Sequence, residues 1–287
     1  MNILVIGGCG YIGSILVPEL LLNGHKVHVL DNLRYQQRPF LDICHHKEFA
    51  ITVGDCRDEK IISSLVSSHD VVIMLAAIVG SPQCDAQPFD AMTTNLDAVY
   101  LLLRHLSPNQ YLLYPCTNSG YGIGKDNVFC TEESPLNPIS LYGRTKVKAE
   151  KCILERGNAI SFRLATVCGS SPCLRTSLLV NNFVLQAYRD AVVVLFESHF
   201  KRNYIHVRDV AQAFLLGIEK FNDMKNNIYN VGLSIANLSK RELCEKIKEH
   251  LDFVIIEHAF AKDPDQRNYI VSNDKIEKQG FVPKWNV

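Results

Sequence analysis

The chain has 287 residues, of which 30 are lysine or arginine and 30 are aspartate or glutamate, so its formal net charge is zero. This length suffices for one large domain or for a domain with an appendage, and the balanced charge predicts no surface for nucleic acid. No apolar run reaches the about 18 to 20 residues that a membrane-spanning helix needs, so we expect no membrane partner.

The 10 cysteines are dispersed, without the spacing of a disulfide framework or of a Cys-x-x-Cys metal site. The first residues, MNILVIGGCG, resemble a folded strand and turn rather than a cleavable signal. We therefore expect a reduced, cytoplasmic protein that binds no metal, and we interpret most of the cysteines as small core residues.

The first 168 residues alternate short apolar runs with amphipathic segments. NILVIG, KVHVLD, EFAITVGD, DVVIMLAA and QYLLYPCT are typical strands, whereas YIGSILVPELLLNG, EKIISSLVSS and PFDAMTTNLDAVYLLLRHLS are typical helices. Runs that are apolar throughout indicate parallel strands that are buried on both faces. The pattern predicts an α/β fold with a doubly wound parallel sheet, a Rossmann domain, in residues 1–168.

Residues 1–168 also contain a predicted helix at about 141–154, which begins near the proline at 138, and after it the strand AISFRLATV.

A smaller α+β lobe that binds the substrate is expected in residues 169–287. There, RTSLLVNNFVLQAYRD predicts a helix, VVVLF a strand, and NYIHVRDVAQAFLLGIEK a strand that runs into a helix. Ser239 and Glu242 have the spacing of a capping box. The chain is expected to return to the first domain around residues 202–220.

A glycine-rich turn, VIGGCGYIG, lies directly between the first strand and the first helix. Gly7, Gly10 and Gly13 would let a pyrophosphate approach backbone N–H groups at the helix N-terminus. Asp31 ends the next strand, where its carboxylate would bind the adenosine ribose and repel a 2′-phosphate. The sequence therefore predicts NAD rather than NADP, although Arg34 could soften this preference. The alternative is an ordinary strand-to-helix turn.

Further residues are expected along the same nucleotide. Asp55 in GDCRD follows the third strand and could reach the adenine amino group; the alternative is a helix N-cap. The small residues of LAAIVG suit a backbone that passes flat against the nucleotide. The predicted cofactor-binding residues are Gly7, Gly10, Tyr11, Ile12, Gly13, Asp31, Asn32, Asp55, Cys56, Leu75, Ala76, Ala77, Asn95, Tyr142 and Lys146.

Tyr142 and Lys146 lie four residues apart in LYGRTKVKAE, and therefore on one face of the predicted helix. A lysine ammonium and a nicotinamide cation would both favour the phenolate, so the tyrosine could act as general base toward a sugar hydroxyl. Tyrosine and lysine also occur at this spacing by chance. The pair gains weight from Thr117 in CTNSGYG, which could supply the second hydroxyl that orients the substrate.

These motifs, in this order and over nearly the whole chain, resemble the extended short-chain dehydrogenase/reductase family, in its branch of nucleotide-sugar epimerases and dehydratases. The resemblance implies a catalytic triad of Thr117, Tyr142 and Lys146. It also implies that two arginines in RNYIHV and DPDQRNY hold the diphosphate of a sugar nucleotide; the alternative for each is a surface salt bridge. The implied substrate-binding residues are Thr117, Asn118, Ser119, Asn181, Arg202 and Arg267.

Family members share oxidation at the sugar C4 and differ in the step after it. In 4,6-dehydratases the tract matching 117–119 ends in a glutamate that takes the C5 proton, whereas here it reads Thr117, Asn118 and Ser119. Neither an amide nor an unactivated hydroxyl replaces that base, so dehydration is disfavoured. Stretches such as PCTNSGYGIG and DPDQRNYIVSN resemble bacterial capsule enzymes that oxidise C4 of GDP-D-glycero-α-D-manno-heptose.

The leading interpretation is therefore an NAD-dependent 4-dehydrogenase that acts on a GDP-linked sugar. A 4-epimerase of the same fold and a non-catalytic NAD(H)-binding sensor are the alternatives. Segments 88–106 and 141–154 resemble the helices with which family members form a four-helix bundle, so a homodimer is expected. Relatives continue beyond the position of FVPKW into a last helix, which we expect to be missing here.

Overall fold

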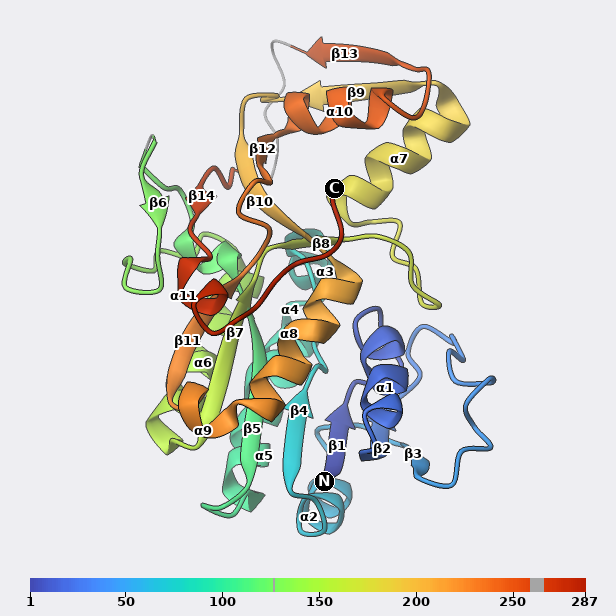
Figure 1. Ribbon diagram of the computed structural model, residues 1–287, viewed down its shortest axis with the longest axis vertical. Helices are drawn as coiled ribbons and strands as arrows, with labels where there is room; N and C mark the ends of the chain where they lie inside the picture. Colours follow the sequence, from blue (N-terminus) through green and yellow to red (C-terminus); the bar gives the residue numbers. More distant parts are fainter. Residues whose placement is uncertain (126, 259–265) are drawn as a thin grey trace.

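The computed structural model describes residues 1–125, 127–258 and 266–287. Its central feature is a parallel sheet of seven strands: β1 (Asn2–Ile6), β2 (Lys26–Asp31), β3 (Phe49–Val53), β4 (Val71–Met74), β5 (Tyr111–Thr117), β7 (Ala159–Leu164) and β11 (Asn227–Val231). Their order across the sheet is β11-β7-β5-β4-β1-β2-β3 (Figure 1). The order reverses at β1, which pairs with β2 and with β4, and open parallel sheets bind ligands beyond the carboxyl ends of the strands at such a point. The predicted doubly wound sheet is confirmed.

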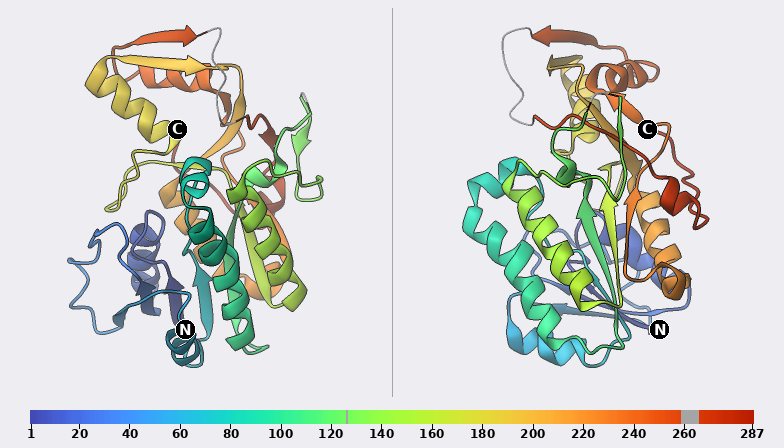
Figure 2. Two further views of the ribbon diagram at one scale, coloured as in Figure 1. Left: turned by 180° about the vertical axis from the view of Figure 1, so that it is seen from behind. Right: turned by 90° about the vertical axis from the view of Figure 1, so that its left-hand side faces the viewer.

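Helices cover both faces of this sheet (Figure 2). On one face lie α1 (Gly13–Leu22) and α8 (Val207–Glu219), and on the other lie α2 (Glu59–Val66), α5 (Ala98–His105) and α6 (Leu141–Arg156). In β1, Ile3 and Val5 pack toward α1, whereas Leu4 and Ile6 pack toward α2 and α5. Successive side chains of a strand point to opposite faces, so both sets of positions must be apolar, which explains the uniform runs.

The long helix expected at 88–106 is interrupted. After α3 (Ser81–Ala86), the chain forms α4 (Pro88–Met92), a π-helical turn η1 (Thr93–Asp97) and then α5. Helix α6 begins at Leu141, where the sequence predicts its start, and the hydroxyl of Ser140 caps it by accepting a bond from Gly143 N at 3.1 Å. The start of helix α7 (Leu179–Asp190) differs from the sequence pattern, because this helix begins after a loop at 173–178.

A second lobe sits beyond the carboxyl ends of the large sheet (Figure 1). Strands β8 (Thr166–Cys168), β10 (Lys201–His206) and β12 (Asn237–Ser239) form one small sheet; β9 (Val192–Phe196) pairs with β13 (Val254–His258), and β6 (Phe129–Cys130) with β14 (Ile270–Val271). Helix α10 (Lys240–Lys248) and α7 pack on the β9–β13 pair. Short helices are η2 (Asn118–Tyr121), α9 (Phe221–Met224) and α11 (Asp274–Glu277).

The capping box at Ser239 is confirmed. The Ser239 hydroxyl accepts a bond from Glu242 N at 3.1 Å, and the Glu242 carboxylate accepts one from Ser239 N at 2.7 Å, so two orphan donors of α10 are satisfied reciprocally. The chain returns to the large sheet over residues 207–231 rather than 202–220, because β10 belongs to the small sheet, α8 covers the large sheet and β11 extends its edge. In the described ranges, no helix is both long and apolar enough to cross a bilayer.

Candidate active site

A cavity of about 1120 Å³ lies between the carboxyl ends of the central strands and the second lobe. Its walls come from the glycine-rich turn, the ends of β2, β4 and β5, helix α6, and the loop at 173–178. The predicted residues that line it are Gly7, Gly10, Tyr11, Ile12, Gly13, Asp31, Asn32, Cys56, Leu75, Ala76, Ala77, Thr117, Ser119, Tyr142, Lys146, Arg202 and Arg267. Four predicted residues, Asp55, Asn95, Asn118 and Asn181, are not on the wall.

The glycine-rich turn brings bare backbone to the cavity at the start of α1. Gly7 has φ +83°, and a Cβ added there would collide with the backbone nitrogen of Ala76 at the end of β4. Only glycine therefore fits this position without strain. The backbone of the turn and the N-terminus of α1 face the cavity together, which fits the pyrophosphate of a dinucleotide.

Asp31 is held in a fixed orientation beside this turn. One carboxylate oxygen accepts a bond from Cys9 N at 2.9 Å, and the other accepts one from Leu33 N at 2.8 Å. Burial raises the pKa of Asp31, and these two bonds lower it. The carboxylate lies on the cavity wall with lone pairs to spare, so the site fits the ribose hydroxyls predicted for it.

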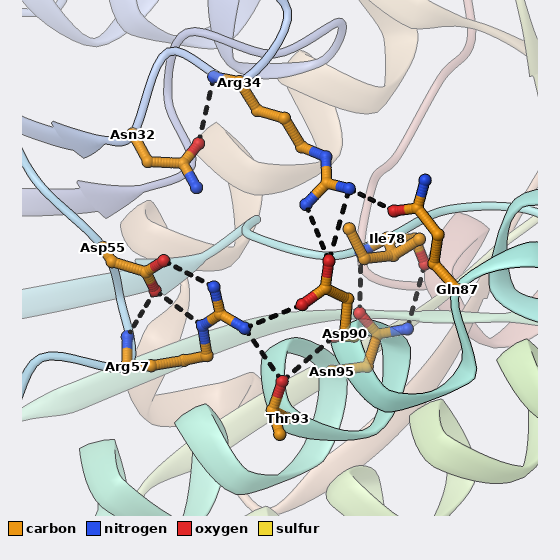
Figure 3. A network of polar contacts seen from close by, with 9 residues as sticks. All are labelled: Asn32, Arg34, Asp55, Arg57, Ile78, Gln87, Asp90, Thr93 and Asn95. Carbon is orange, nitrogen blue, oxygen red and sulfur yellow. Dashed lines mark hydrogen bonds and ion pairs between the residues drawn. The ribbon is translucent and has the colours of Figure 1, made fainter.

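The N-cap alternative for Asp55 is wrong. Helix α2 is capped by Asp58, whose carboxylate accepts bonds from Lys60 N at 2.9 Å and from Ile61 N at 3.3 Å. Asp55 instead forms a bidentate ion pair with Arg57, at 2.9 Å to Nε and 2.7 Å to Nη2 (Figure 3). Hydrogen bonds from Arg57 lower the pKa of Asp55. Its carboxylate thus faces an arginine, and its contact with adenine remains a prediction.

Asn95 lies behind the cavity wall rather than on it. From the π-helical turn η1, its amide oxygen accepts a bond from Ile78 N at 2.7 Å and its amide nitrogen donates to Ile78 O at 2.9 Å (Figure 3). The side chain is 1% exposed. These two bonds to one residue fix the strand end that carries Leu75, Ala76 and Ala77 along the cavity. Asn95 therefore positions the predicted nucleotide-binding backbone.

The predicted catalytic pair lies on one face of α6, and both side chains reach the cavity. Lys146 is 2% exposed, and its ammonium lies 3.9 Å above the centre of the Tyr114 ring. Burial lowers the pKa of Lys146 to about 8, against the opposing fields of Cys116 and Glu150. Burial raises the pKa of Tyr142. A desolvated phenol of this kind releases its proton only when positive charge is held beside it.

Thr117 and Ser119 form a small hydroxyl chain opposite that pair. Thr117 Oγ1 accepts a bond from Ser119 N at 3.1 Å and donates to Ser119 Oγ at 2.9 Å. Arg267 Nη1 also donates to Ser119 Oγ. Ser119 is thereby left with its own proton to donate, and Thr117 with a free lone pair. Asn118 between them is buried, and its amide has no hydrogen-bond partner among the described residues.

Arg202 and Arg267 line the same cavity from the second lobe. Arg202 is 3% exposed, so a surface salt bridge does not describe it. Asn181, expected on the substrate, instead holds the loop before α7: it accepts a bond from Gly169 N and donates to Arg175 O, both at 3.0 Å. Its neighbour Asn182 is the one on the cavity wall.

Arg175 is a cavity residue that the sequence pattern missed. Its guanidinium donates to Val79 O at 3.2 Å and lines the cavity near Tyr142, whose pKa its charge lowers. The periodicity of RTSLLVNNFVLQAYRD predicts this arginine in a helix. The signal in the sequence for a loop is the proline at 172, shortly before this charged residue.

All ten cysteines are free, and eight of them are buried. Cys9, Cys56 and Cys173 lie on the cavity wall. Burial raises the pKa of Cys9 and of Cys56 to about 12, so these two thiols stay protonated and unreactive near neutral pH.

Comparison with known proteins adds a family and several relatives. Residues 3–232 match the family model described as "NAD dependent epimerase/dehydratase family". A UDP-glucose 4-epimerase of Lactobacillus helveticus is 28% identical over 274 residues, which cover 86% of this chain and 82% of the relative. The low-salt glycan biosynthesis protein Agl12 of Haloferax volcanii is 29% identical, over 100% of this chain and 94% of its own.

Solved structures of similar fold agree with this assignment. The crystal structure of UDP-glucose 4-epimerase with UDP-glucose from Thermotoga maritima has a TM-score of 0.86 and 26% identity, and covers 100% of this chain and 94% of its own. The fold thus has counterparts in proteins whose names describe chemistry on nucleotide sugars.

Proposed function

Because the chain belongs to the NAD dependent epimerase/dehydratase family, we propose that it is a nucleotide-sugar 4-epimerase that uses NAD. The observation that carries the proposal is the convergence of Thr117, Tyr142 and Lys146 on one cavity with the glycine-rich turn and Asp31. The loop Thr117–Ser119 contains no carboxylate, which disfavours the proton transfer that a 4,6-dehydratase needs. Epimerisation needs no such base.

The side chains divide the proposed reaction between them. Tyr142 takes the proton of the C4 hydroxyl as the C4 hydrogen leaves as hydride. It returns that proton after the keto sugar has rotated and the hydride has been delivered to the opposite face of C4. The charges of Arg175 and Arg267 lower the pKa of Tyr142, and the Lys146 ammonium on the same helix is proposed to add to this stabilisation of the phenolate. Thr117 accepts a bond from a sugar hydroxyl and orients the ring. NAD, when bound, supplies the hydride acceptor and donor.

Arg202 and Arg267 are proposed to bind the diphosphate of the substrate. Both guanidiniums line the end of the cavity that the second lobe covers. Their permanent charge and forked donors match phosphate oxygens. Arg267 also reaches Ser119, so the group that binds the diphosphate contacts the loop that orients the sugar.

The choice of epimerase over net dehydrogenase is supported by the relatives. Several proteins of similar sequence, from Lactobacillus helveticus, Halalkalibacterium halodurans and Corynebacterium glutamicum, are UDP-glucose 4-epimerases. Net oxidation of a GDP-linked heptose is the second candidate, because PCTNSGYGIG and DPDQRNYIVSN resemble enzymes with that activity. None of these three relatives carries that name.

Product analysis separates these candidates. The protein is incubated with UDP-glucose, and separately with a GDP-heptose, while proton NMR follows the sugar and absorbance near 340 nm follows the nicotinamide. A C4 stereoisomer without net NADH supports the epimerase. A ketone with one NADH per sugar would establish the dehydrogenase instead. Tyr142→Phe should abolish either reaction but keep NAD binding; unchanged turnover of a confirmed substrate in this variant would refute the role of Tyr142.

We also propose that the chain forms a homodimer through α4, α5 and α6. Helices α5 and α6 lie side by side (Figure 2), on the face of the large sheet that α2 also covers. Phe89 and Met92 of α4 are exposed. A second copy would cover these side chains in a four-helix bundle. Light scattering should give twice the chain mass of 32.3 kDa; a monomer at micromolar concentration would contradict the proposal.

A further inference from the structure

A network of charged side chains (Figure 3) includes Arg34, which lies on the cavity wall near Asp31, at the end expected to hold the adenosine. The centre of the network is Asp90 on α4. One oxygen of Asp90 accepts a bond from Arg57 Nη1 at 3.2 Å, and the other accepts bonds from Arg34 at 3.4 and 3.5 Å. Arg34 also donates to Gln87, and Arg57 to Thr93 at 3.0 Å. One carboxylate therefore joins arginines from the loops that follow two neighbouring strands, β2 and β3.

The position of Arg34 gives this network its significance. Asp31, Asn32 and Arg34 line the cavity from the end of β2 and the loop after it, and residues 80–83 line it from the start of α3. The Arg34 side chain reaches from its loop to Gln87 and Asp90 at the start of α4 (Figure 3). It thus connects the loop beside Asp31, where an adenosine would bind, to the helical segment that follows residues 80–83.

We propose that Asp90 is a cofactor-retention residue, which closes the adenosine end of the cavity through Arg34 and Arg57 and slows the release of NAD(H). The inference rests on the NAD dependence of the family and not on the proposed 4-epimerase activity. It bears on that activity, because an enzyme that returns the hydride to the same sugar has to keep the reduced cofactor between the two steps.

A second consequence concerns the charge of Arg34. It is the cation nearest in sequence to Asp31, and a 2′-phosphate on the ribose would need such a partner. In this arrangement its guanidinium is already bound to Asp90 and Gln87. Removing the Asp90 carboxylate should therefore improve the binding of NADP relative to NAD, an effect that loss of packing alone would not produce.

The expected change in the rate of NADH release depends on how exposed the ion pairs of Asp90 are to solvent. The side chains of Arg34 and Arg57 are 30% and 33% exposed, and that of Asp90 is 36% exposed. A partly exposed ion pair contributes up to about 1 kcal/mol, which corresponds to about a five-fold change in rate. Since Asp90 pairs with two arginines, we expect Asp90→Ala to accelerate NADH release about five- to twenty-fold.

The test is a displacement experiment. Protein loaded with NADH is mixed with excess NAD in a stopped-flow instrument, and the decay of nicotinamide fluorescence gives the release rate for wild type, Asp90→Ala, Asp90→Asn, Arg34→Ala and the Asp90→Ala/Arg34→Ala double variant. The matched control is Glu59→Ala, which removes an exposed carboxylate of α2 that pairs with His105 at 3.0 Å, away from the cavity wall. Dissociation constants for NAD and NADP are measured on the same proteins.

We expect faster NADH release in every Asp90 and Arg34 variant. The effect of the double variant should be smaller than the sum of the effects of the two single changes. The release rate of the Glu59→Ala control should stay within two-fold of that of wild type. Release from wild type should also accelerate with salt. Unchanged release in Asp90→Asn and Arg34→Ala, or additive effects in the double variant, would overturn it. Because Arg34 is in a loop and Asn keeps the shape of Asp90, these variants test the proposal even if Asp90→Ala does not fold. No substrate enters the assay, so a failure of the 4-epimerase proposal leaves its outcome unaffected.

Discussion

Replacing Glu150 with alanine should be among the most destabilising single changes in the helix that carries Tyr142 and Lys146. Glu150 lies on α6 and accepts bonds from Arg163 on β7 at 2.7 Å to Nη2 and 3.1 Å to Nε, and from the Ser161 hydroxyl at 2.6 Å. The side chains of Arg163 and Glu150 are 4% and 3% exposed. This buried ion pair therefore links the predicted catalytic helix α6 to strand β7 of the central sheet.

The expected loss of stability comes from the buried charge of Arg163, which would lose its carboxylate partner. Without Glu150, the Arg163 guanidinium keeps neutral partners, Tyr121 Oη at 3.2 Å and Glu132 O at 3.1 Å, which cannot balance its charge in this buried place. Breaking a buried ion pair from one side typically costs about 3 to 5 kcal/mol. We expect Glu150→Ala to lower the free energy of unfolding by this amount, a large part of the stability of an ordinary domain.

Urea denaturation followed by far-ultraviolet circular dichroism measures this change. The matched control lies on the same helix: Lys151 and Glu155 form a pair at 3.9 Å with side chains 78% and 62% exposed. Glu155→Ala should change the free energy of unfolding by about 0.5 kcal/mol or less. If Glu150→Ala costs less than about 1 kcal/mol, or no more than the control, the assignment of a structural ion pair is wrong.

Three further predictions concern the site itself. The free energy of unfolding of wild type, relative to that of Lys146→Met, should rise between about pH 8 and pH 10.5. Burial lowers the pKa of Lys146 to about 8, so in this range the unfolded chain binds more protons than the folded protein. Parallel urea titrations would detect the rise, and its absence would refute the lowered pKa. Arg175→Ala should move the acid limb of the pH profile of kcat to higher pH, because its charge lowers the pKa of Tyr142, whereas Arg144→Ala on the exposed face of α6 should not move it. Gly7→Ala should weaken NAD binding at least about ten-fold by calorimetry, since its Cβ would collide with Ala76; an unchanged affinity would show that the turn has room to shift.

The sequence predicted the large sheet well because buried parallel strands must be apolar on both faces, a pattern that is visible without any tertiary information. The glycine-rich turn, Asp31 and the Tyr142–Lys146 spacing can also be recognised in the sequence alone, since each motif depends on a few neighbouring residues. The interrupted helix at 88–106 cannot, because a π-helical turn leaves the apolar periodicity of its flanks intact.

The roles of two predicted asparagines depend on contacts with distant parts of the chain. Asn95 binds the backbone of Ile78, and Asn181 binds Gly169 N. An isolated amide in a sequence does not disclose whether it faces a ligand or a backbone. Arg175 is the opposite case: it directly precedes an apolar run, so the pattern predicts it in the helix, whereas the structure places it in a loop on the cavity wall.

The fate of the hydride tests the central claim most directly. A UDP-hexose labelled with deuterium at C4 is incubated with the protein, with and without added NAD, and the products are examined by mass spectrometry and NMR. A 4-epimerase should give the C4 stereoisomer with the deuterium still at C4 and no labelled NADH in solution. Deuterium that leaves as free NADH, together with an unlabelled 4-keto sugar, would contradict the proposal and establish a net dehydrogenase.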